Sequence, residues 1–395
     1  MNHKLRVLFI IPSFTTGGAE RQLCVLAQHM DQDQFDVHVL FYYAPGTDTN
    51  GKKWQEGLDL SGVNLHFLDK RPGPIGYLAA LPRILGLMYR IRPDILHGYM
   101  DGNLLALLLG FLFHKRVVWG IRRTSQDLSQ LNRLNLCLLK VDIWLSPFVD
   151  LIIFNSESGR LSYGRMGMRS PRMQVVPNGF DIDQFSPDIS PGTTQRQLWG
   201  IPDDVPLIGI VARLHPTKDH PTFLRAVQRL SQEWPTAKFV CVGDGSTEYA
   251  ESLRIHTKSL GVSDRVIWPG TCSQMPAVYN ALTILVLSST DEGFPNAVGE
   301  AMACGIPCVV TRVGDAARII GDTGFVAEIG DDEAIANAVS TLLRESGDAR
   351  VARGRACRQR ICASFSVQAL ARNTEQALMA LFPGSPKRDS SNGMS

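Results

Sequence analysis

The sequence has no C-x-x-C pair and no Cys/His cluster with the spacing of a zinc site, although eight of its 395 residues are cysteine. A structural zinc site or a disulfide-stabilised secreted domain is therefore not expected. Several of the cysteines lie inside apolar segments, where the thiol acts as a small hydrophobic group. This distribution is typical of a reducing compartment, and we expect a cytoplasmic protein, including one bound peripherally at the inner face of a membrane.

The sequence also lacks an apolar run long enough to cross a bilayer. The longest, LLALLLGFLF at 104–113, is predicted to form a buried helix rather than a helix that dips into a membrane surface. The N-terminal MNHKLRVLFIIPS is too short in its apolar part for a signal peptide, and Pro12 ends that part. We expect it to form the first β-strand.

No strong charge excess is present, because 40 Lys and Arg stand against 38 Asp and Glu. A nucleic-acid binder usually concentrates basic residues, so that class is disfavoured. The first 190 residues carry 20 basic and 17 acidic side chains, a mild positive bias. It is compatible with an anionic acceptor or a membrane surface and requires neither.

Short apolar runs without polar alternation recur along the chain and are separated by helical patterns. LRVLFII, DILHGY, RVVWGI and DLIIFN are examples in the first half, and PLIGIVA, AKFVCVG and ILVLSS in the second. Such runs are typical of strands buried on both faces of a parallel sheet. Alternation with helices predicts βαβ units, and the length predicts two α/β domains with doubly wound parallel sheets.

The predicted domain boundaries follow composition. A Pro-, Asp- and Gly-rich stretch interrupts the pattern before it restarts at Pro206, and the last residues are polar. We predict an N-terminal domain at 1–185, a linker at 186–204, a C-terminal domain at 205–364, a helix crossing back to the N-terminal domain at 365–382, and a disordered tail at 383–395.

The first predicted strand is followed by a loop containing Gly17 and Gly18. Glycines there let a ligand approach the backbone, and the helix that follows offers its N-terminus to an anion. The motif is not the G-x-G-x-x-G fingerprint of dinucleotide enzymes. An ordinary strand-to-helix turn explains these two glycines equally well.

In the second half, Arg213 and Lys218 follow a predicted strand in the segment VARLHPTKDHP. Ligands of open α/β sheets bind at the carboxyl ends of the strands. A guanidinium and an ammonium there suit a diphosphate, although two solvated cations in a loop are the alternative.

The segment DEGFPNAVGE places Glu292 in a predicted loop and Glu300 on the helix that follows. Pro295 suits the first turn of that helix, and Gly305 suits its end. Paired acids can be catalytic, metal-binding, sugar-binding or merely solvated. Their separation along the chain disfavours a shared proton.

Taken together, these segments resemble the retaining glycosyltransferases of family 4, which have the GT-B fold. EGFPNAVGE with AMACGIPCVVT resembles the E-x7-E signature of that family, and VARLHPTK resembles its phosphate loop. The Gly17-Gly18 turn, VVPNGFDIDQF and WPGTCSQMPAVYNALTILVLSST resemble its first loop, interdomain segment and base-side segment. The resemblance covers nearly the whole chain.

The resemblance implies roles at the matching positions. Arg213 and Lys218 would hold the diphosphate and stabilise it as it leaves, Glu292 would orient the hydroxyls of the sugar, and Glu300 would bind the ribose. Backbone groups at 293–298 and in the first loop would line sugar and phosphates, and the base would rest near 271–275. The implied donor-side set, besides the two glutamates and two cations, is Gly17, Gly18, Thr271, Met275, Gly293, Phe294, Pro295, Asn296, Ala297 and Val298.

The acceptor side departs from the family pattern. His97 is expected to face the acceptor or to be a satisfied histidine at a strand end, and Tyr99 stands where many relatives have a second histidine. Asp101 and Asn103 would line the same cleft or cap the next helix, and Arg122 would contact an anionic acceptor. Arg318 replaces a glutamate common in relatives, which weakens any carry-over there.

The expected function is transfer of a hexose-type sugar from a UDP- or GDP-sugar, with retention, to a hydroxyl of a glycan or lipid-linked acceptor in cell-surface polysaccharide synthesis. No cofactor or metal and no nucleic-acid partner is expected. A sugar-nucleotide epimerase of the same fold and a glycoside hydrolase using Glu292 and Glu300 stay as alternatives. An oxidoreductase is disfavoured by the missing fingerprint, and a binding protein with a dead site is disfavoured by the intact charged set.

Overall fold

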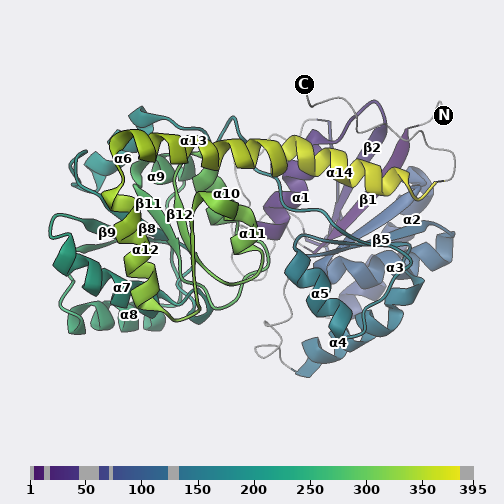
Figure 1. Cartoon of the computed structure of the whole chain (residues 1–395). Coiled ribbons are helices and arrows are strands. Elements are labelled where there is room, and N and C mark those ends of the chain that lie inside the picture. Colours follow the sequence, from purple (N-terminus) through teal and green to yellow (C-terminus); the bar gives the residue numbers. More distant parts are fainter. Residues whose placement is uncertain (1–3, 13–17, 44–61, 71–73, 123–132, 383–395) are drawn as a thin grey trace.

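The computed structural model describes residues 4–12, 18–43, 62–70, 74–122 and 133–382. Gly17 and the predicted tail at 383–395 lie outside these residues. Two parallel sheets organise the chain, each covered by helices on both faces (Figure 1). This confirms the predicted α/β class with two doubly wound sheets.

The first sheet has seven strands, all parallel. Its order is β3 (Asn64–Phe67), β2 (Phe35–Phe41), β1 (Leu5–Ile11), β4 (Ile95–Tyr99), β5 (Arg116–Ile121), β6 (Leu151–Phe154) and β7 (Met173–Val175). The central strands β1, β4 and β6 are almost completely buried, as their unbroken apolar runs predict.

The second sheet has six parallel strands. Its order is β10 (Val266–Gly270), β9 (Lys238–Val242), β8 (Leu207–Val211), β11 (Ile284–Leu287), β12 (Cys308–Thr311) and β13 (Phe325–Ala327). The strands β7, β12 and β13 are absent from the predicted set, because runs of three or four residues cannot be distinguished from loops by pattern alone.

The helices of the first half lie on two sides of its sheet. Residues of α1 (Gly18–His29) pack in one apolar cluster, and residues of α2 (Pro74–Ile91), α3 (Asn103–Phe113) and α4 (Arg133–Leu145) pack in or against another. The helix α5 (Glu157–Arg165) follows β6. Three short 3-10 helices matter below, namely η1 (Met100–Gly102), η3 (Ser146–Phe148) and η4 (Pro216–Lys218).

The second half also has helices on two sides of its sheet. The last two helices of the chain extend from this half to the first half. The helices before them are α6 (Ile189–Leu198), α7 (His220–Glu233), α8 (Thr247–Ser259), α9 (Met275–Ala281), α10 (Asn296–Ala303), α11 (Ala316–Ile320) and α12 (Asp332–Arg344). Figure 1 shows α13 (Gly347–Ser364) and α14 (Val367–Met379) running across both sheets. Apolar residues of α14, such as Leu370 and Leu378, complete the cluster beside β1 in the first half.

The apolar run at 104–113 forms α3, and here the prediction needs correction. The helix buries Ala106, Leu107 and Leu109, but it leaves Leu108, Phe111 and Leu112 exposed. A run that is apolar on every side of a helix has more apolar surface than one sheet face can cover. No helix in the described part of the chain is long and apolar enough to span a bilayer.

Candidate functional site

A cavity of about 390 Å3 lies where the carboxyl ends of the two sheets meet. Loops and helix ends of both halves line it, as expected for open α/β sheets. Its lining comprises Gly18, Ala19, Glu20, Met100, Arg122, Asn155, Asn178, Arg213, Thr217, Lys218, Asp291, Glu292, Gly293, Phe294, Pro295 and Asn296. The structure therefore brings together nine of the residues singled out in the sequence, from four separate segments.

Lys218 and Glu292 form an ion pair in the wall of this cavity. The Nζ of Lys218 lies 2.5 Å from Oε1 of Glu292, and both side chains are mostly buried. Ser289 donates its hydroxyl to the same oxygen at 2.7 Å. The other carboxylate oxygen, Oε2, has no partner among the described residues, so it is available to a ligand hydroxyl.

The loop that carries Lys218 is fixed to the end of β11. Ser288, completely buried, donates to the backbone carbonyls of Lys218 and Asp219 at 2.9 and 3.0 Å. The N–H of Thr290 donates to the carbonyl of Thr217 at 2.8 Å. These bonds hold the ammonium group beside Glu292 without requiring a ligand, which is the preorganisation that electrostatic stabilisation needs.

Arg213 supplies a second cation to the cavity. It follows β8, is exposed, and makes no ion pair with any described residue. An exposed guanidinium costs little to redirect toward a phosphate, and its fork of donors matches phosphate oxygens. The cavity therefore has two cations on the same wall: Lys218, whose position is fixed by its loop, and Arg213, whose side chain is free to reorient.

The backbone at Gly314 and Asp315 packs closely against the loop at 292–294, which precedes α10. Gly314 has φ of +51°, and a Cβ there would lie 2.2 Å from the carbonyl oxygen of Glu292. The N–H of Asp315 donates to the carbonyl of Gly293 at 3.0 Å. Because α10 begins at Asn296, its first N–H groups have no partner within the helix and can turn to an anion.

Glu300 lies on the buried face of α10 and does not line the cavity. Tyr279 donates its hydroxyl to Oε2 of Glu300 at 2.7 Å, and Arg21 of α1 lies 3.1 Å from Oε1. Burial raises the pKa of Glu300, and Arg21 and the Tyr279 hydrogen bond oppose that rise. With both oxygens occupied, Glu300 is poorly placed as an acid or base beside Glu292.

The contact between Arg21 and Glu300 joins the two halves, and three further contacts do the same. Asn178 donates to the side-chain oxygen of Asn296 at 2.8 Å. The carboxylate of Asp315, nearly buried, accepts from the backbone N–H of Glu157 at 2.9 Å and of Ser158 at 3.0 Å. A residue of the second half thus caps helix α5 of the first half, and its own N–H holds the loop beside Glu292.

Among the residues that the sequence suggested for an acceptor, Arg122 reaches the cavity from the end of β5. It donates to the hydroxyl of Tyr99 at 2.7 Å and to Asn178 at 3.3 Å. Its guanidinium also lies over the ring of Tyr99, 4.8 Å from the centroid. Burial raises the pKa of Tyr99, and Arg122 opposes that rise.

The expectation that His97 faces an acceptor is wrong for this structure. Its ring is completely buried between Phe9 and Tyr99, with centroids 5.0 and 4.8 Å away, and neither ring nitrogen has a hydrogen-bond partner among the described residues. Burial, followed by the charge of Arg122, lowers the pKa of His97 well below its usual value. The ring is a neutral part of the core rather than a lining group.

The other predicted residues lie outside the cavity wall. Asp101 is exposed in η1, and Asn103 is buried at the start of α3 with its carbonyl accepting from Trp119 at 2.8 Å. Val298 is buried in the core of the second half, whereas Ala297 is half-buried. Thr271 is exposed before α9, and Met275 is its half-buried first residue.

Seven lining residues were not proposed as ligand contacts from the sequence: Ala19, Glu20, Met100, Asn155, Asn178, Thr217 and Asp291. Asn155 directly follows the buried strand β6, and Asn178 belongs to the interdomain segment VVPNGF. The positions of both residues in the sequence could therefore have indicated a place in the cavity wall. Met100 has φ of +52°, and no sequence pattern predicts such a conformation for methionine.

The described residues contain no group of three or more His, Cys, Asp or Glu side chains that could hold a metal ion.

Two family models match the chain. Residues 16–184 match the model described as Glycosyltransferase Family 4, and residues 205–345 match the model described as Glycosyl transferases group 1. These matches include every strand from β2 to β13 and leave out β1 and the last two helices, α13 and α14.

Among curated proteins, the chain is 26% identical over 235 residues to UDP-Gal:alpha-D-GlcNAc-diphosphoundecaprenol alpha-1,3-galactosyltransferase of Escherichia coli. That alignment covers 57% of this chain and 59% of the E. coli protein, less than two thirds of its length. The chain is also 25% identical to the putative glycosyltransferase EpsF of Bacillus subtilis, over 87% of this chain and 88% of EpsF.

Solved structures share the fold. Anabaena Alr3699/HepE in complex with UDP superposes with a TM-score of 0.81 at 21% identity, covering 95% of this chain and all of that one. WaaG, a glycosyltransferase involved in lipopolysaccharide biosynthesis, gives 0.70 at 16% identity, covering 96% of this chain and all of WaaG. At these identities the likeness establishes the two-domain GT-B architecture and nothing about substrates.

Proposed function

This chain belongs to glycosyltransferase family 4, and from that premise we propose that it transfers a hexose-type sugar from a UDP- or GDP-sugar to an acceptor hydroxyl. The observation that carries the proposal is the Lys218–Glu292 pair, set beside the adaptable Arg213 at the cavity between the two sheets. A carboxylate oxygen for a sugar hydroxyl and two cations for a diphosphate lie on one wall.

In the proposed reaction the bond between the anomeric carbon and the diphosphate oxygen breaks, and a bond to the acceptor oxygen forms on the same face. The acceptor proton passes to the departing diphosphate. Lys218 and Arg213 stabilise the negative charge that develops on the leaving group, together with the first N–H groups of α10. No residue needs to act as a nucleophile, and Glu292 positions the sugar.

We propose that the transfer needs no metal ion, because the two cations supply the charge that a divalent metal would otherwise provide. Turnover that persists undiminished in a chelator is the expected result. Loss of turnover in the chelator, restored by a divalent cation, would contradict this part of the proposal.

Glu300 would bind the ribose of the donor. Its two carboxylate oxygens now contact Arg21 and Tyr279, so the ribose diol would take the place of Arg21. Since Arg21 comes from the first half and Glu300 from the second, donor binding would exchange a contact between the halves for a contact with the ligand.

The acceptor is proposed to be a glycan or lipid-linked intermediate of cell-surface polysaccharide synthesis, at the cytoplasmic face of the membrane. The E. coli relative is named for a diphosphoundecaprenol-linked acceptor. Arg122, at the cavity wall and held by Tyr99 and Asn178, offers a guanidinium to an anionic group of such an acceptor.

The test is a panel of UDP- and GDP-sugars incubated with the protein and lipid-linked diphosphate acceptors. We expect nucleoside diphosphate release that depends on the acceptor, and a product with the anomeric configuration of the donor. Conversion of a donor without any acceptor would favour the epimerase alternative, and cleavage of a glycoside without a nucleotide would favour the hydrolase.

A further inference from the structure

Hydrogen bonds connect three side chains across the cavity, from the first half to the second. Arg122 donates from Nη1 to Oδ1 of Asn178 at 3.3 Å, and Asn178 donates from Nδ2 to Oδ1 of Asn296 at 2.8 Å. All three residues line the cavity. Arg122 follows β5 of the first sheet, whereas Asn296 is the first residue of α10 in the second half.

The chemistry of arginine determines the direction of these hydrogen bonds. A guanidinium has N–H donors and no acceptor, and it stays protonated in proteins. The atom of Asn178 that faces Arg122 must therefore be its oxygen, which turns its NH2 group toward Asn296. Asn296 in turn accepts with its own oxygen, so its NH2 group points away from Asn178. An amide that could present either end is thus held in one orientation.

The first two residues of this chain are themselves fixed. Tyr99 accepts from Nη2 of Arg122 at 2.7 Å. Asn178 is only 4% exposed, and the backbone beside it is bound by Gln22 of α1. Gln22 donates to the carbonyl of Gly179 and accepts from its N–H, both at 2.9 Å. All these contacts lie within the protein, so the orientation of the amides requires no ligand.

The NH2 group of Asn296 lies at the start of α1. A Cβ placed on Gly18 would lie 3.0 Å from Nδ2 of Asn296. Among the described residues, the side chain of Asn296 bonds only to Asn178, so Nδ2 has its donors to offer. The helices α1 and α10 both begin here, and the first N–H groups of each have no partner within the helix.

A phosphate group suits this point of the cavity. Its oxygens are strong hydrogen-bond acceptors, and the N-termini of two helices favour negative charge. Arg213 and Lys218 border the same cavity. If the amide of Asn296 were flipped, its carbonyl oxygen would face the phosphate and repel it. The orientation of one amide therefore decides whether Asn296 attracts or repels the ligand.

We propose that Nδ2 of Asn296 donates to the second phosphate of the donor, the one that carries the sugar, and that Arg122, through Asn178, keeps the amide in its donating orientation. Asn296 is then a binding residue for the leaving group, and Asn178 and Arg122 are positioning residues. The inference rests on the proposed function, because it assigns a contact to the diphosphate of that donor. Arg122 uses two of its five N–H groups here, so others stay available to an acceptor.

The test is titration calorimetry of the full chain with UDP and UMP, and with GDP and GMP. A monophosphate has the same base and ribose and lacks the second phosphate. Asn296→Ala should raise the Kd of the nucleoside diphosphate at least about tenfold and leave that of the monophosphate unchanged. Asn296→Asp still accepts from Asn178 but presents an anionic oxygen to the phosphate, so its Kd for the diphosphate should rise further.

Asn178→Asp tests the chain without changing a group that touches the donor. The new carboxylate still accepts from Arg122 but has no N–H for Asn296, so the amide of Asn296 should flip and turn its oxygen toward the phosphate. We expect at least about tenfold weaker binding of the diphosphate in Asn178→Asp. Adding Asn178→Asp to Asn296→Ala should cause less than about twofold further loss, because the flipping amide is already gone.

A spectroscopic measurement reports the amide directly. The side-chain amide resonance of Asn296 in a 15N spectrum is identified by its absence from Asn296→Ala. It should shift when UDP or GDP is added to the wild type, and it should shift much less in Asn178→Asp. The control for added charge is Asn64→Asp, at the amino end of β3 and away from the cavity, which should bind nucleotides as the wild type does.

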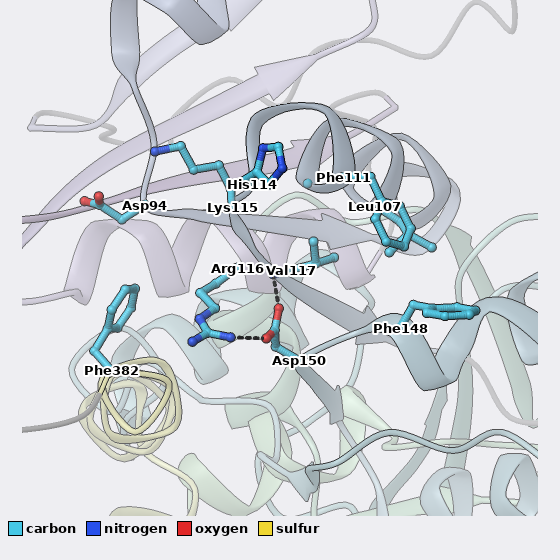
Figure 2. Close-up of a pocket in the computed structure, with 11 residues that line it drawn as sticks. Asp94, Leu107, Phe111, His114, Lys115, Arg116, Val117, Phe148, Asp150 and Phe382 are labelled. Atoms are coloured by element: carbon cyan, nitrogen blue, oxygen red, sulfur yellow. Dashed lines mark hydrogen bonds and ion pairs between the residues drawn. The ribbon is translucent and has the colours of Figure 1, made fainter.

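A second cavity with a free cation provides a further control. It has a volume of about 460 Å3 and lies at the amino ends of the strands of the first sheet, where His114, Lys115, Arg116 and Phe148 of η3 line it (Figure 2). Arg116 pairs with Asp150 at 2.7 Å, whereas Lys115 makes no ion pair with any described residue. A nucleotide held by positive charge alone would respond to Lys115→Gln, and we expect no change in that variant.

The inference is overturned if the wild type binds UDP or GDP and Asn296→Ala binds it equally well. It is also overturned if Asn178→Asp weakens diphosphate and monophosphate binding alike, or if its loss adds in full to that of Asn296→Ala. Failure of the proposed function looks different, since neither UDP nor GDP would then bind the wild type. Denaturant titration of each variant confirms folding, and Asn296, which is only half-buried, keeps the test valid if Asn178→Asp does not fold.

Discussion

Lys218 and Glu292 are 74 residues apart in the chain, and their side chains meet at 2.5 Å in the wall of the cavity between the two sheets. The strands β8 and β11 are neighbours in the second sheet, so the loops at their carboxyl ends necessarily lie side by side. A diphosphate sugar placed against these loops meets a cation and a carboxylate at once.

Replacing either partner of this pair should abolish transfer while the protein stays folded. We expect Glu292→Gln and Lys218→Ala each to lower turnover at least about a hundredfold, because each removes a charge aimed at the donor. The cost in stability should be no more than about 1–3 kcal/mol. Nucleoside diphosphate release and chemical denaturation measure the two effects.

The control for that experiment is the surface pair of Arg312 and Glu328, which are 2.7 Å apart with both side chains mostly exposed. Arg312→Gln should change neither turnover nor stability by a measurable amount. Unaltered turnover in Glu292→Gln or in Lys218→Ala would refute the roles given to them.

Arg21→Ala should make the stability of the protein more sensitive to pH. The pKa of Glu300 is raised by burial and held down by Arg21, so removing the guanidinium raises that pKa further. A carboxyl group with a raised pKa stabilises the folded state below its unfolded pKa, and this stability is lost as the pH rises through the folded value.

The free energy of unfolding should therefore fall more at pH 8 than at pH 5 when Arg21 is replaced. Denaturant titrations of the wild type and Arg21→Ala at the two pH values measure it. An equal loss at both would show that Arg21 acts through packing against Phe185, which its guanidinium overlies at 5.4 Å, and not through the charge of Glu300.

Asp315→Ala should affect both stability and donor use. The carboxylate caps α5 of the first half, and loss of a cap typically costs about 1 kcal/mol. Because the backbone of Asp315 also holds the loop at Gly293, we expect the KM for the donor to rise as well.

Asp331 provides the comparison, since its side chain caps α12 within the second half at 2.8 Å. Asp331→Ala should cost similar stability and leave the donor KM unchanged. If the two variants behave alike in steady-state kinetics, the contact between the halves at Asp315 has no part in positioning the donor loop.

His97→Phe should retain turnover, because the imidazole makes no hydrogen bond to any part of the chain that the structure describes and is enclosed by Phe9 and Tyr99. Because the pKa of His97 is lowered in the folded wild type, the stability that this residue contributes is present above its unfolded pKa, near 6.5. That contribution is lost as the pH falls below this value. The variant should therefore unfold less readily than the wild type in mild acid. A turnover loss of more than about tenfold would restore an acceptor role for His97.

Asp142 should destabilise the protein above neutral pH. Burial, and then the charge of Asp101, raises its pKa to about 7. The contribution of Asp142 to the free energy of unfolding is complete below pH 3.8, the ordinary pKa of the group, and is lost as the pH rises through its folded-state pKa of about 7. Asp142→Asn should raise the Tm at pH 8 and leave it unchanged at pH 4, and a rise of equal size at both pH values would contradict the shift.

Much of this fold could be predicted because parallel sheets leave a strong pattern. The strands β1, β5 and β8 are continuous apolar runs between polar loops, and their alternation with helices determines the class. The roughly equal spacing of two such sets predicts two sheets. Short edge strands such as β7 and β13 escape prediction because three residues carry too little pattern.

The candidate site was predictable where a short motif within a single loop carries a charged group, as for Lys218 after β8 and for Glu292 after β11. It was not predictable where contacts depend on how the halves meet. No pattern pairs Arg21 with Glu300, or Asp315 with the start of α5, because these residues come from different sheets. The burial of His97 likewise depends on Phe9 and Tyr99, which local sequence cannot place around it.

Titration calorimetry with UDP and with GDP tests the central claim, a diphosphate site between Lys218, Arg213 and the start of α10. We predict that one nucleotide binds the wild type and the Arg312→Gln control alike, and that Lys218→Ala and Arg213→Ala each weaken its binding at least about tenfold. Absence of binding by both nucleotides at a Kd below about 1 mM, or an affinity unchanged in Lys218→Ala, would contradict the account.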